Sequence, residues 1–256
     1  MSQTEQYEKC SWQFYLKRVE RVTPRPAAWS IQGTAFHSAA EALEKSGRAK
    51  GEEEVVQLFS DQYSAMVNGA MQKEPNLDRW MTAMKKPAGQ DIEDRYHLGQ
   101  NQVRDYVRWS VENKPVTSYV LDPEKGRKVG LELYFKVELG GVPVRGYIDM
   151  LVSEEDSTTR VRDWKTGSTK SHFQLETYKV AVEKRFGLEV NKGDWYMGKT
   201  GKLSRTVDLS EVTEDQVAAR YVTMDQGVKA GRFVANPGFD CGFCDVSHAC
   251  SYFRTR

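Results

Sequence analysis

Two aspartates and a lysine in the middle of the chain have the residue types and the spacing of a metal-dependent hydrolytic site. Asp149 lies in the apolar run 146–152, and Asp163 and Lys165 lie in a second strand-like run that ends at Lys165. The polar segment between the runs is short enough for a hairpin, so we expect Asp149 and Asp163 to lie together, with Lys165 on the face of Asp163. Two carboxylates with an ammonium beside them suit Mg²⁺-assisted hydrolysis of a phosphodiester.

Asp149 stands in apolar surroundings, because Ile148 and Met150 flank it directly. The simpler alternative is that both aspartates are surface acids on a hairpin with a lysine nearby. A carboxylate in an apolar strand is unfavourable unless a cation pairs with it, so the sequence favours a metal ligand. A lysine near a metal-bound water can have its pKa lowered enough to act as a base.

Hydrophobic periodicity predicts the elements that must position these residues. Strands are expected at about 130–139, 142–152 and 160–165, with Gly140-Gly141 as a two-residue turn, and a second hairpin is expected at 194–199 and 202–209. Helices are expected at about 2–19, from Gly33, over most of 52–114, at 171–186 and, capped by Thr213, at 213–231. This order predicts an α/β chain of the α+β kind, with a central sheet flanked by helices.

The stretch from residue 52 to residue 114 has helical periodicity but no chemical motif. We interpret it as a helical insert, about 52–115, that forms a subdomain or a cap over the sheet and is broken near Pro75 and Pro87. Its large aromatic residues are interpreted as core and not as a base-stacking platform; they are Trp80, Tyr96, Tyr106 and Trp109. No repeat or linker is visible, so residues 1–256 are predicted to form a single domain.

Four segments together resemble one branch of a known nuclease superfamily. They are Gly33-Thr34-Ala35-Phe36-His37, Gly146-Tyr147-Ile148-Asp149, Asp163-Trp164-Lys165-Thr166-Gly167, and Gln174 with Tyr178 four residues later. In order and approximate spacing these segments are similar to the RecB-like branch of the PD-(D/E)XK nuclease superfamily. The resemblance implies a restriction-endonuclease-like mixed sheet and a DNA nuclease that depends on Mg²⁺ or Mn²⁺.

The resemblance also implies a role for each residue of the motifs. His37, Asp149, Asp163 and the backbone carbonyl of Trp164 would hold the divalent ion. Lys165 would orient or deprotonate the attacking water and stabilise the charge that develops on the phosphoryl group. By its own sequence context, His37 could equally be a packed helix histidine.

Three further residues have supporting roles in the resemblance. Gln174 and Tyr178 lie one turn apart on the helix that follows, and they would position the DNA strand or the active-site groups. Glu132, on the strand before Asp149, is an accessory acid of lower weight. The alternative for Gln174 and Tyr178 is an ordinary amphipathic helix.

The four cysteines form a second constellation. Cys241, Cys244 and Cys250 have the spacing Cys-x2-Cys-x5-Cys, and Cys10 stands alone near the start. Clustered cysteines in a reducing compartment bind metal more often than they form disulfides, and four thiolates suit either an iron–sulfur cluster or Zn²⁺. The alternative is four unligated thiols, which would leave the C-terminal three as crowded reactive groups.

The cysteine spacing is similar to that of iron–sulfur members of the same branch. These members include CRISPR-associated adaptation nucleases and cluster-bearing exonucleases. The resemblance implies a 4Fe–4S cluster that ties residues 241–250 to Cys10, and so joins the two ends of the chain. A proline that often follows the first cysteine is Ser11 here.

Charge and hydropathy limit the classes of partner. A net charge of only +1 excludes a protein coated in basic residues, so contacts with DNA phosphates must come from local cations. The candidates are Lys17, Arg18, Arg21, Arg145, Arg162 and Lys170. No stretch approaches a membrane span and the N-terminus lacks the apolar core of a signal peptide, so no membrane partner and a cytoplasmic location are expected.

The sequence therefore predicts an exonuclease that hydrolyses phosphodiester bonds at DNA ends in recombination, repair, or CRISPR or phage DNA processing. The expected partner is single-stranded or end-containing DNA. Recombination proteins, CRISPR adaptation proteins and a second copy of the chain are candidate protein partners. The first alternative is a non-catalytic DNA-end-binding subunit of such a complex, and the second is a ribonuclease that uses the same metal cage.

Overall fold

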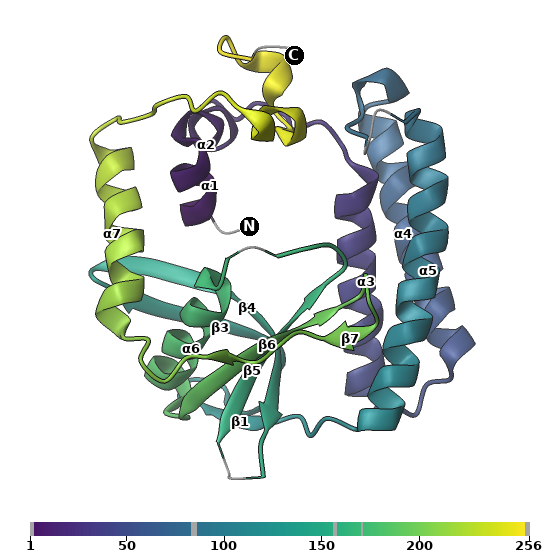
Figure 1. The fold of residues 1–256 in the computed structure, drawn as a ribbon, viewed down its shortest axis with the longest axis vertical. Helices are drawn as coiled ribbons and strands as arrows, with labels where there is room; N and C mark the ends of the chain where they lie inside the picture. Colours follow the sequence, from purple (N-terminus) through teal and green to yellow (C-terminus); the bar gives the residue numbers. More distant parts are fainter. Residues whose placement is uncertain (1–2, 83–85, 156–157, 170, 254–256) are drawn as a thin grey trace.

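The computed structural model describes residues 3–82, 86–155, 158–169 and 171–253, and Figure 1 shows their arrangement. The helices are α1 (Gln3–Lys9), α2 (Ser11–Arg18), α3 (Ala28–Lys45), α4 (Glu52–Lys73), η1 (Leu77–Arg79), α5 (Ala88–Asn113), α6 (Phe173–Phe186), α7 (Glu214–Lys229), η3 (Phe239–Phe243) and η4 (Ser247–Ala249). The strands are β1 (Tyr119–Asp122), β2 (Gly126–Val129), β3 (Leu131–Leu139), β4 (Val142–Ser153), β5 (Thr159–Lys165), β6 (Val190–Met197), β7 (Lys202–Leu203) and β8 (Val207–Asp208).

The main sheet has the strand order β3-β4-β5-β6-β7, and β8 also pairs with β6. β3, β4 and β5 form the predicted antiparallel meander, whereas β5 and β6 run parallel. Gly140 and Gly141 make the turn between β3 and β4 with φ angles of 58° and 80°, a conformation that favours glycine. This mixed sheet with helices on both faces confirms the predicted fold class.

Two groups of helices cover opposite faces of the sheet. α6 and α7 pack on one face, in a cluster with the apolar residues of β3 and β4. α3, α4 and α5 pack on the other face, in a second cluster that includes Trp164 and Tyr196 of the sheet. The four aromatic residues of the 52–114 stretch belong to this second cluster or pack against it, which confirms that they are core: Trp80, Tyr96, Tyr106 and Trp109.

Some predicted bounds are wrong. The expected single helix at 2–19 is broken at Cys10, whose backbone is extended (φ −161°, ψ 99°) between α1 and α2. α3 begins at Ala28, ahead of Gly33. β6 begins at Val190 and pairs in parallel with β5, so the hairpin expected at 194–209 belongs to the main sheet. The hairpin β1–β2 was not predicted, because each strand has only four residues and β2 is polar and largely exposed.

The N-terminal helices and the C-terminal segment lie side by side, as the purple and yellow ends of the ribbon show in Figure 1. The amide of Trp12 donates to the carbonyl of Val234 at 3.2 Å, and the amide of Arg25 donates to that of Asp245 at 2.8 Å. These contacts bring Cys10 to the segment that carries the other three cysteines. Within the described residues, no helix is both long and apolar enough to cross a membrane.

Candidate metal and catalytic site

The site lies where β4 and β5 separate. Their ladder ends at the pair Met150 and Arg162, so the next residues toward the fork are Asp149 and Asp163. The amide of Trp164, which has no ladder partner on β4, donates to Asp149 Oδ2 at 2.7 Å. Both aspartates are buried, with 5% and 0% of their surface exposed. The predicted hairpin thus brings the two carboxylates together inside the protein.

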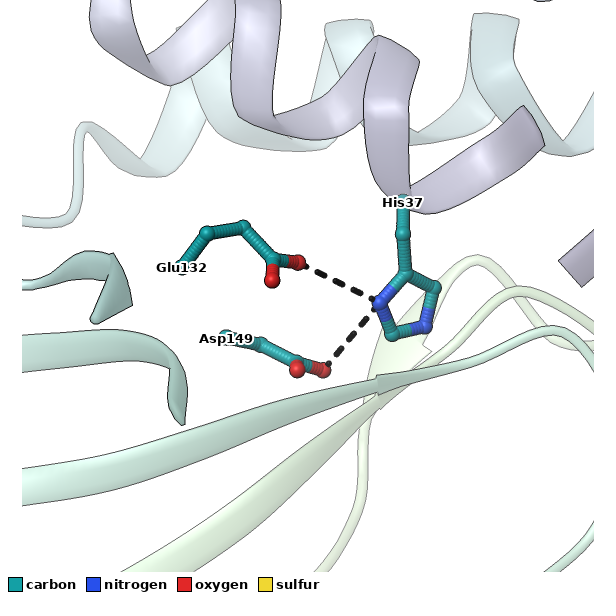
Figure 2. Close-up of side chains that lie close together, drawn as sticks. All are labelled: His37, Glu132 and Asp149. Atoms are coloured by element: carbon teal, nitrogen blue, oxygen red, sulfur yellow. Dashed lines mark ion pairs between the residues drawn. The ribbon is translucent and has the colours of Figure 1, made fainter. Parts of the chain in front are cut away.

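His37 reaches this fork from α3, as Figure 2 shows. Its Nδ1 lies 3.5 Å from Asp149 Oδ2 and 3.6 Å from Glu132 Oε1. One ligand atom from each of His37, Glu132 and Asp149 lies within 4.8 Å of the others, so the three residues could hold one metal ion. Glu132, the accessory acid of lower weight in the sequence analysis, is part of this group.

The tautomer of His37 is fixed by the backbone of β5. His37 Nε2 lies 2.8 Å from the carbonyl oxygen of Trp164. Because a carbonyl oxygen only accepts, Nε2 carries the hydrogen and donates it, and in the neutral ring Nδ1 is left with its lone pair toward the carboxylates. Histidine ligands are typically oriented in this way by a second hydrogen bond. An ion held by Nδ1 would lie on the opposite side of the ring from this carbonyl, so the oxygen of Trp164 reaches the same ion only if the His37 ring turns.

Glu132 takes its position through an uncommon backbone conformation. Its φ is +43°, in the left-handed region, where a residue with a side chain is rare. The strand changes face at this point: Leu131 and its partner Met150 pack under α3–α5, whereas Leu133 and its partner Ile148 pack under α6–α7. Glu132 and Asp149 lie between these pairs. Simple strand alternation does not predict such a switch.

The charges of the site shift two pKa values upward. Burial alone would lower the pKa of His37, but Asp149, a hydrogen bond with Glu132 and the charge of Asp163 outweigh it and raise the pKa to about 9. Burial, followed by the like charge of Asp163, raises the pKa of Asp149 to about 8. The metal-free site therefore retains protons that a divalent cation would displace.

On the α6 side of the fork, Asp163 is the first of four polar side chains that contact one another in sequence. Lys165 Nζ lies 2.7 Å from Asp163 Oδ2 and donates to Gln174 Oε1 at 2.8 Å. Gln174 Nε2 donates in turn to the hydroxyl of Tyr178 at 2.7 Å. Burial and the nearby charges of Asp149 and Asp163 raise the pKa of Tyr178, so its hydroxyl stays protonated. The structure thus brings all four predicted residues into one row.

The donors present suit a hard divalent cation. Carboxylate oxygens with one imidazole are ligands that Mg²⁺ and Mn²⁺ accept. Asp163 is not in the group of three ligand atoms, but its Oδ1 is buried without a hydrogen-bond partner among the described residues, and its Oδ2 is paired with Lys165. A cavity of about 410 Å³ opens beside the group, lined by His37, Glu132 and the exposed side of α3. Solvent and a phosphate can reach the site from there.

Two glutamines that the sequence analysis did not select hold the end of β5. Gln102 Nε2 donates to the carbonyl of Thr166 at 3.0 Å, and Gln32 Nε2 donates to Gln102 Oε1 at 2.7 Å. Both side chains are almost fully buried. The signal that could have found them is a glutamine on the otherwise apolar face of a helix.

The four cysteines line a cavity of their own, of about 90 Å³, between α2 and the C-terminal segment. None of them forms a disulfide. Burial raises the pKa of Cys244 to about 11, and the neighbouring Cys10 and Cys250 add to the rise. Such thiols become thiolates only when a cation compensates their charge.

The predicted phosphate contacts need one correction. Arg162 is 4% exposed, and its guanidinium binds Asp194 with two hydrogen bonds of 2.7 and 2.9 Å, so it cannot meet a phosphate. Lys17 is paired with Asp245 at 2.6 Å. The remaining candidates are exposed, namely Arg18, Arg21 and Arg145, except that Lys170 lies outside the described residues.

Comparison with known proteins agrees with this geometry. The model of the PD-(D/E)XK nuclease superfamily matches residues 1–251. This chain belongs to that superfamily. Membership indicates a metal-dependent nuclease, and the restriction-endonuclease-like sheet is the fold that the family shares.

Two phage proteins are similar over nearly the whole length. The Gene 69 protein of Mycobacterium phage D29 is 36% identical and that of Mycobacterium phage L5 is 34% identical, with 99% of this chain and 96% of each relative covered. Their names state no activity. The crystal structure of SSO0001 matches 96% of both chains at 11% identity with a TM-score of 0.33, which is too low to support an argument.

Proposed function

We propose that this protein is a Mg²⁺- or Mn²⁺-dependent DNA exonuclease that hydrolyses phosphodiester bonds at DNA ends, and that residues 1–256 act as one RecB-like domain. The observation that carries the proposal is the convergence of His37, Glu132 and Asp149 from three separate elements, next to the row Asp163–Lys165. By the resemblance, this activity would serve recombination, repair, or CRISPR or phage DNA processing; the relatives are phage proteins whose names state no activity.

Each residue has a distinct part in the proposed reaction. His37, Asp149, Asp163 and the carbonyl of Trp164 would hold the ion, with Glu132 beside them. A bound divalent ion supplies charge neutralisation at the phosphate and lowers the pKa of water. Lys165 directs its amino group toward the space beside Asp163, where the ammonium would orient the attacking water and the neutral amine, formed by loss of one proton, would take a proton from it. Gln174 fixes the direction of Lys165, and Tyr178 fixes Gln174.

A digestion experiment tests the proposal. End-labelled single- and double-stranded DNA, and RNA of the same sequence, are incubated with the protein and Mg²⁺, Mn²⁺ or EDTA. We expect DNA to be shortened from its ends only with metal, and Asp163→Ala or Lys165→Ala to abolish this. DNA binding without cleavage under every metal would instead establish a non-catalytic end-binding subunit, and cleavage of RNA alone would establish a ribonuclease.

We also propose that Cys10, Cys241, Cys244 and Cys250 hold a 4Fe–4S cluster. The convergence of all four thiols on one cavity supports this, as does the amide of Gly238, which donates to Cys241 Sγ at 3.4 Å. Four thiolates also suit Zn²⁺, and it is the resemblance to iron–sulfur nucleases that favours the cluster.

Protein purified without oxygen provides the test of the cluster. We expect a brown protein with broad visible absorbance and about four iron atoms per chain. Cys244→Ser is expected to lose the colour and to lower the melting temperature, since it loosens the junction between the chain ends. A colourless protein with stoichiometric zinc would replace the cluster by a zinc site.

A further inference from the structure

β3 and β4 continue past the metal group as a two-stranded ribbon whose outer face is not covered by α3–α5. At its far end Lys136 and Arg145 line a cavity that Gln3 and Thr4 of α1 also border. The inner side chains of the ribbon, such as Leu133 and Val144, pack under α6 and α7. The outer side chains alternate with them and lie on the α3 side of the sheet, beyond the area that α3–α5 cover. Figure 1 shows the ribbon extending from the centre of the sheet toward α7.

Two cross-strand pairs occupy this face. Tyr134 lies opposite Tyr147, with ring centroids 5.3 Å apart, and Lys136 lies opposite Arg145. Tyr147 is 56% exposed, and Lys136 and Arg145 are also exposed. We call Tyr134, Tyr147, Lys136 and Arg145 the ribbon track.

The ribbon track begins next to the metal group. Tyr134 is two residues after Glu132 on β3, and Tyr147 is two residues before Asp149 on β4. A two-residue step along a strand is about 6.8 Å, so the aromatic pair flanks the carboxylates and the cationic pair follows one step farther. A nucleic-acid strand that lies along the ribbon track would therefore end at the candidate metal site.

The cations of the ribbon track are free to meet a phosphate. Among the described residues, neither Lys136 nor Arg145 forms an ion pair, although Glu138 is exposed on the same face. By contrast, Arg162 on the same sheet is paired with Asp194, and Arg220 on α7 is paired with Glu8. Lys125 lies 5.6 Å from the ring centroid of Tyr134 and adds a further positive charge.

The exposed ring of Tyr147, with the half-buried ring of Tyr134 beside it, indicates which form of nucleic acid fits. Bases stack on exposed aromatic side chains with little dependence on sequence, while cations along the groove follow the backbone. The bases of a duplex already stack on their neighbours, so their faces are not accessible except at an end. An unpaired strand presents both its base faces and its phosphates.

We propose that the ribbon track binds single-stranded DNA and leads it to the metal group, with bases stacking on Tyr134 and Tyr147 and phosphates contacting Lys136 and Arg145. The inference rests on the proposed function, because it names the form of substrate that this site takes. It is independent of the direction in which the strand is cleaved.

Fluorescence anisotropy tests the proposal with the metal-free protein in EDTA, which separates binding from cleavage. The probes are a labelled oligothymidine and a blunt hairpin duplex in buffer of low salt. Tyr147→Leu is expected to weaken binding of the oligothymidine about 5- to 150-fold, the range found when one stacking ring is removed. Tyr147→Phe keeps the ring and is expected to bind as the wild type does. Arg145→Gln should lower the slope of log affinity against log salt by about 0.7, the loss of one phosphate contact to a single strand.

Tyr119→Leu is the matched control. Tyr119 is 58% exposed on β1, and Arg127 lies 4.0 Å from its ring centroid, but it is not on the ribbon. Its variant is expected to bind DNA normally, and melting curves will establish that each leucine variant is folded. Wild-type affinity of Tyr147→Leu for the oligothymidine, or an equal loss for the blunt duplex, would overturn the proposal. Either result can occur with metal-dependent cleavage intact, so failure of the ribbon track is distinguishable from failure of the nuclease assignment.

Discussion

Replacing Asp163 with asparagine is expected to raise the melting temperature of the metal-free protein although it abolishes cleavage. Asp163 is fully buried beside Asp149, and its charge helps to raise the pKa of that residue to about 8. Above about pH 8, where Asp149 is ionised, the substitution would remove the repulsion between the two carboxylates and keep the size of the side chain. Lys165 would lose its ion pair but retain its bond to Gln174, and its side chain is 25% exposed to solvent.

The same substitution at Asp194 is expected to have the opposite effect. Asp194 is 2% exposed and pairs with Arg162 at 2.7 Å and with Arg160 at 3.2 Å. Asp194→Asn leaves the buried guanidinium of Arg162 without a counter-charge, which costs about 3–5 kcal/mol. The two variants differ only in what surrounds the lost charge, so together they test the electrostatic interpretation of the site.

The expected shifts follow from these free energies. Relief of repulsion at Asp163 is on the order of 1 kcal/mol, somewhat less than one pKa unit. For a chain of this size, 1 kcal/mol changes the melting temperature by about 2–4 °C. Asp163→Asn should therefore melt about 2–4 °C higher than the wild type, and Asp194→Asn about 6–20 °C lower.

Added Mn²⁺ separates the two variants further. At a hundredfold excess over the dissociation constant, binding stabilises the folded state by about 2.7 kcal/mol, or roughly 5–11 °C. The wild type and Asp194→Asn should gain this amount, and Asp163→Asn should gain much less. Differential scanning calorimetry at a pH above about 8, with EDTA and with Mn²⁺, provides the measurement. The electrostatic interpretation is refuted if Asp163→Asn melts as far below the wild type as Asp194→Asn does, or gains as much from Mn²⁺ as the wild type.

Three other predictions follow from the contacts of single residues. Glu132→Gln is expected to weaken Mn²⁺ binding by about 10-fold or more in calorimetric titrations, whereas Glu138→Gln, on the exposed part of the same strand, should leave it unchanged. Gln174→Leu removes the acceptor that directs Lys165 and should lower kcat on the order of 100-fold with little change in KM. Gln174→Glu keeps an acceptor and should retain most of the activity. An equal loss of activity in both variants would contradict a positioning role. Gly99→Ala should lower the free energy of unfolding by about 1–3 kcal/mol, because the added Cβ would lie 2.0 Å from the ring of Phe59. Gly69→Ala, in open space on α4, should instead raise the free energy of unfolding by about 0.5–1 kcal/mol. Urea unfolding measures both changes.

Local sequence signals determined the elements that carry the site. Alternating apolar residues specify β4 and β5, and the adjacent glycines at 140–141 specify the turn that starts β4. Thr213 caps α7 as the sequence predicts, forming a capping box with Gln216, and Gly187 ends α6 in the left-handed conformation. These features depend on contacts within a few residues, so the order of residues is sufficient to predict them.

Contacts between distant segments decided the rest. Arg162 is a surface cation by sequence, but β6 joins β5 in parallel and places Asp194 against it, 32 residues away. Cys10 interrupts a stretch with helical periodicity where α2 packs on the C-terminal segment. Glu132 adopts a positive φ where the sheet changes from one helical cover to the other. Each of these outcomes is set by the free energy of packing two separate parts of the chain, which no local pattern contains.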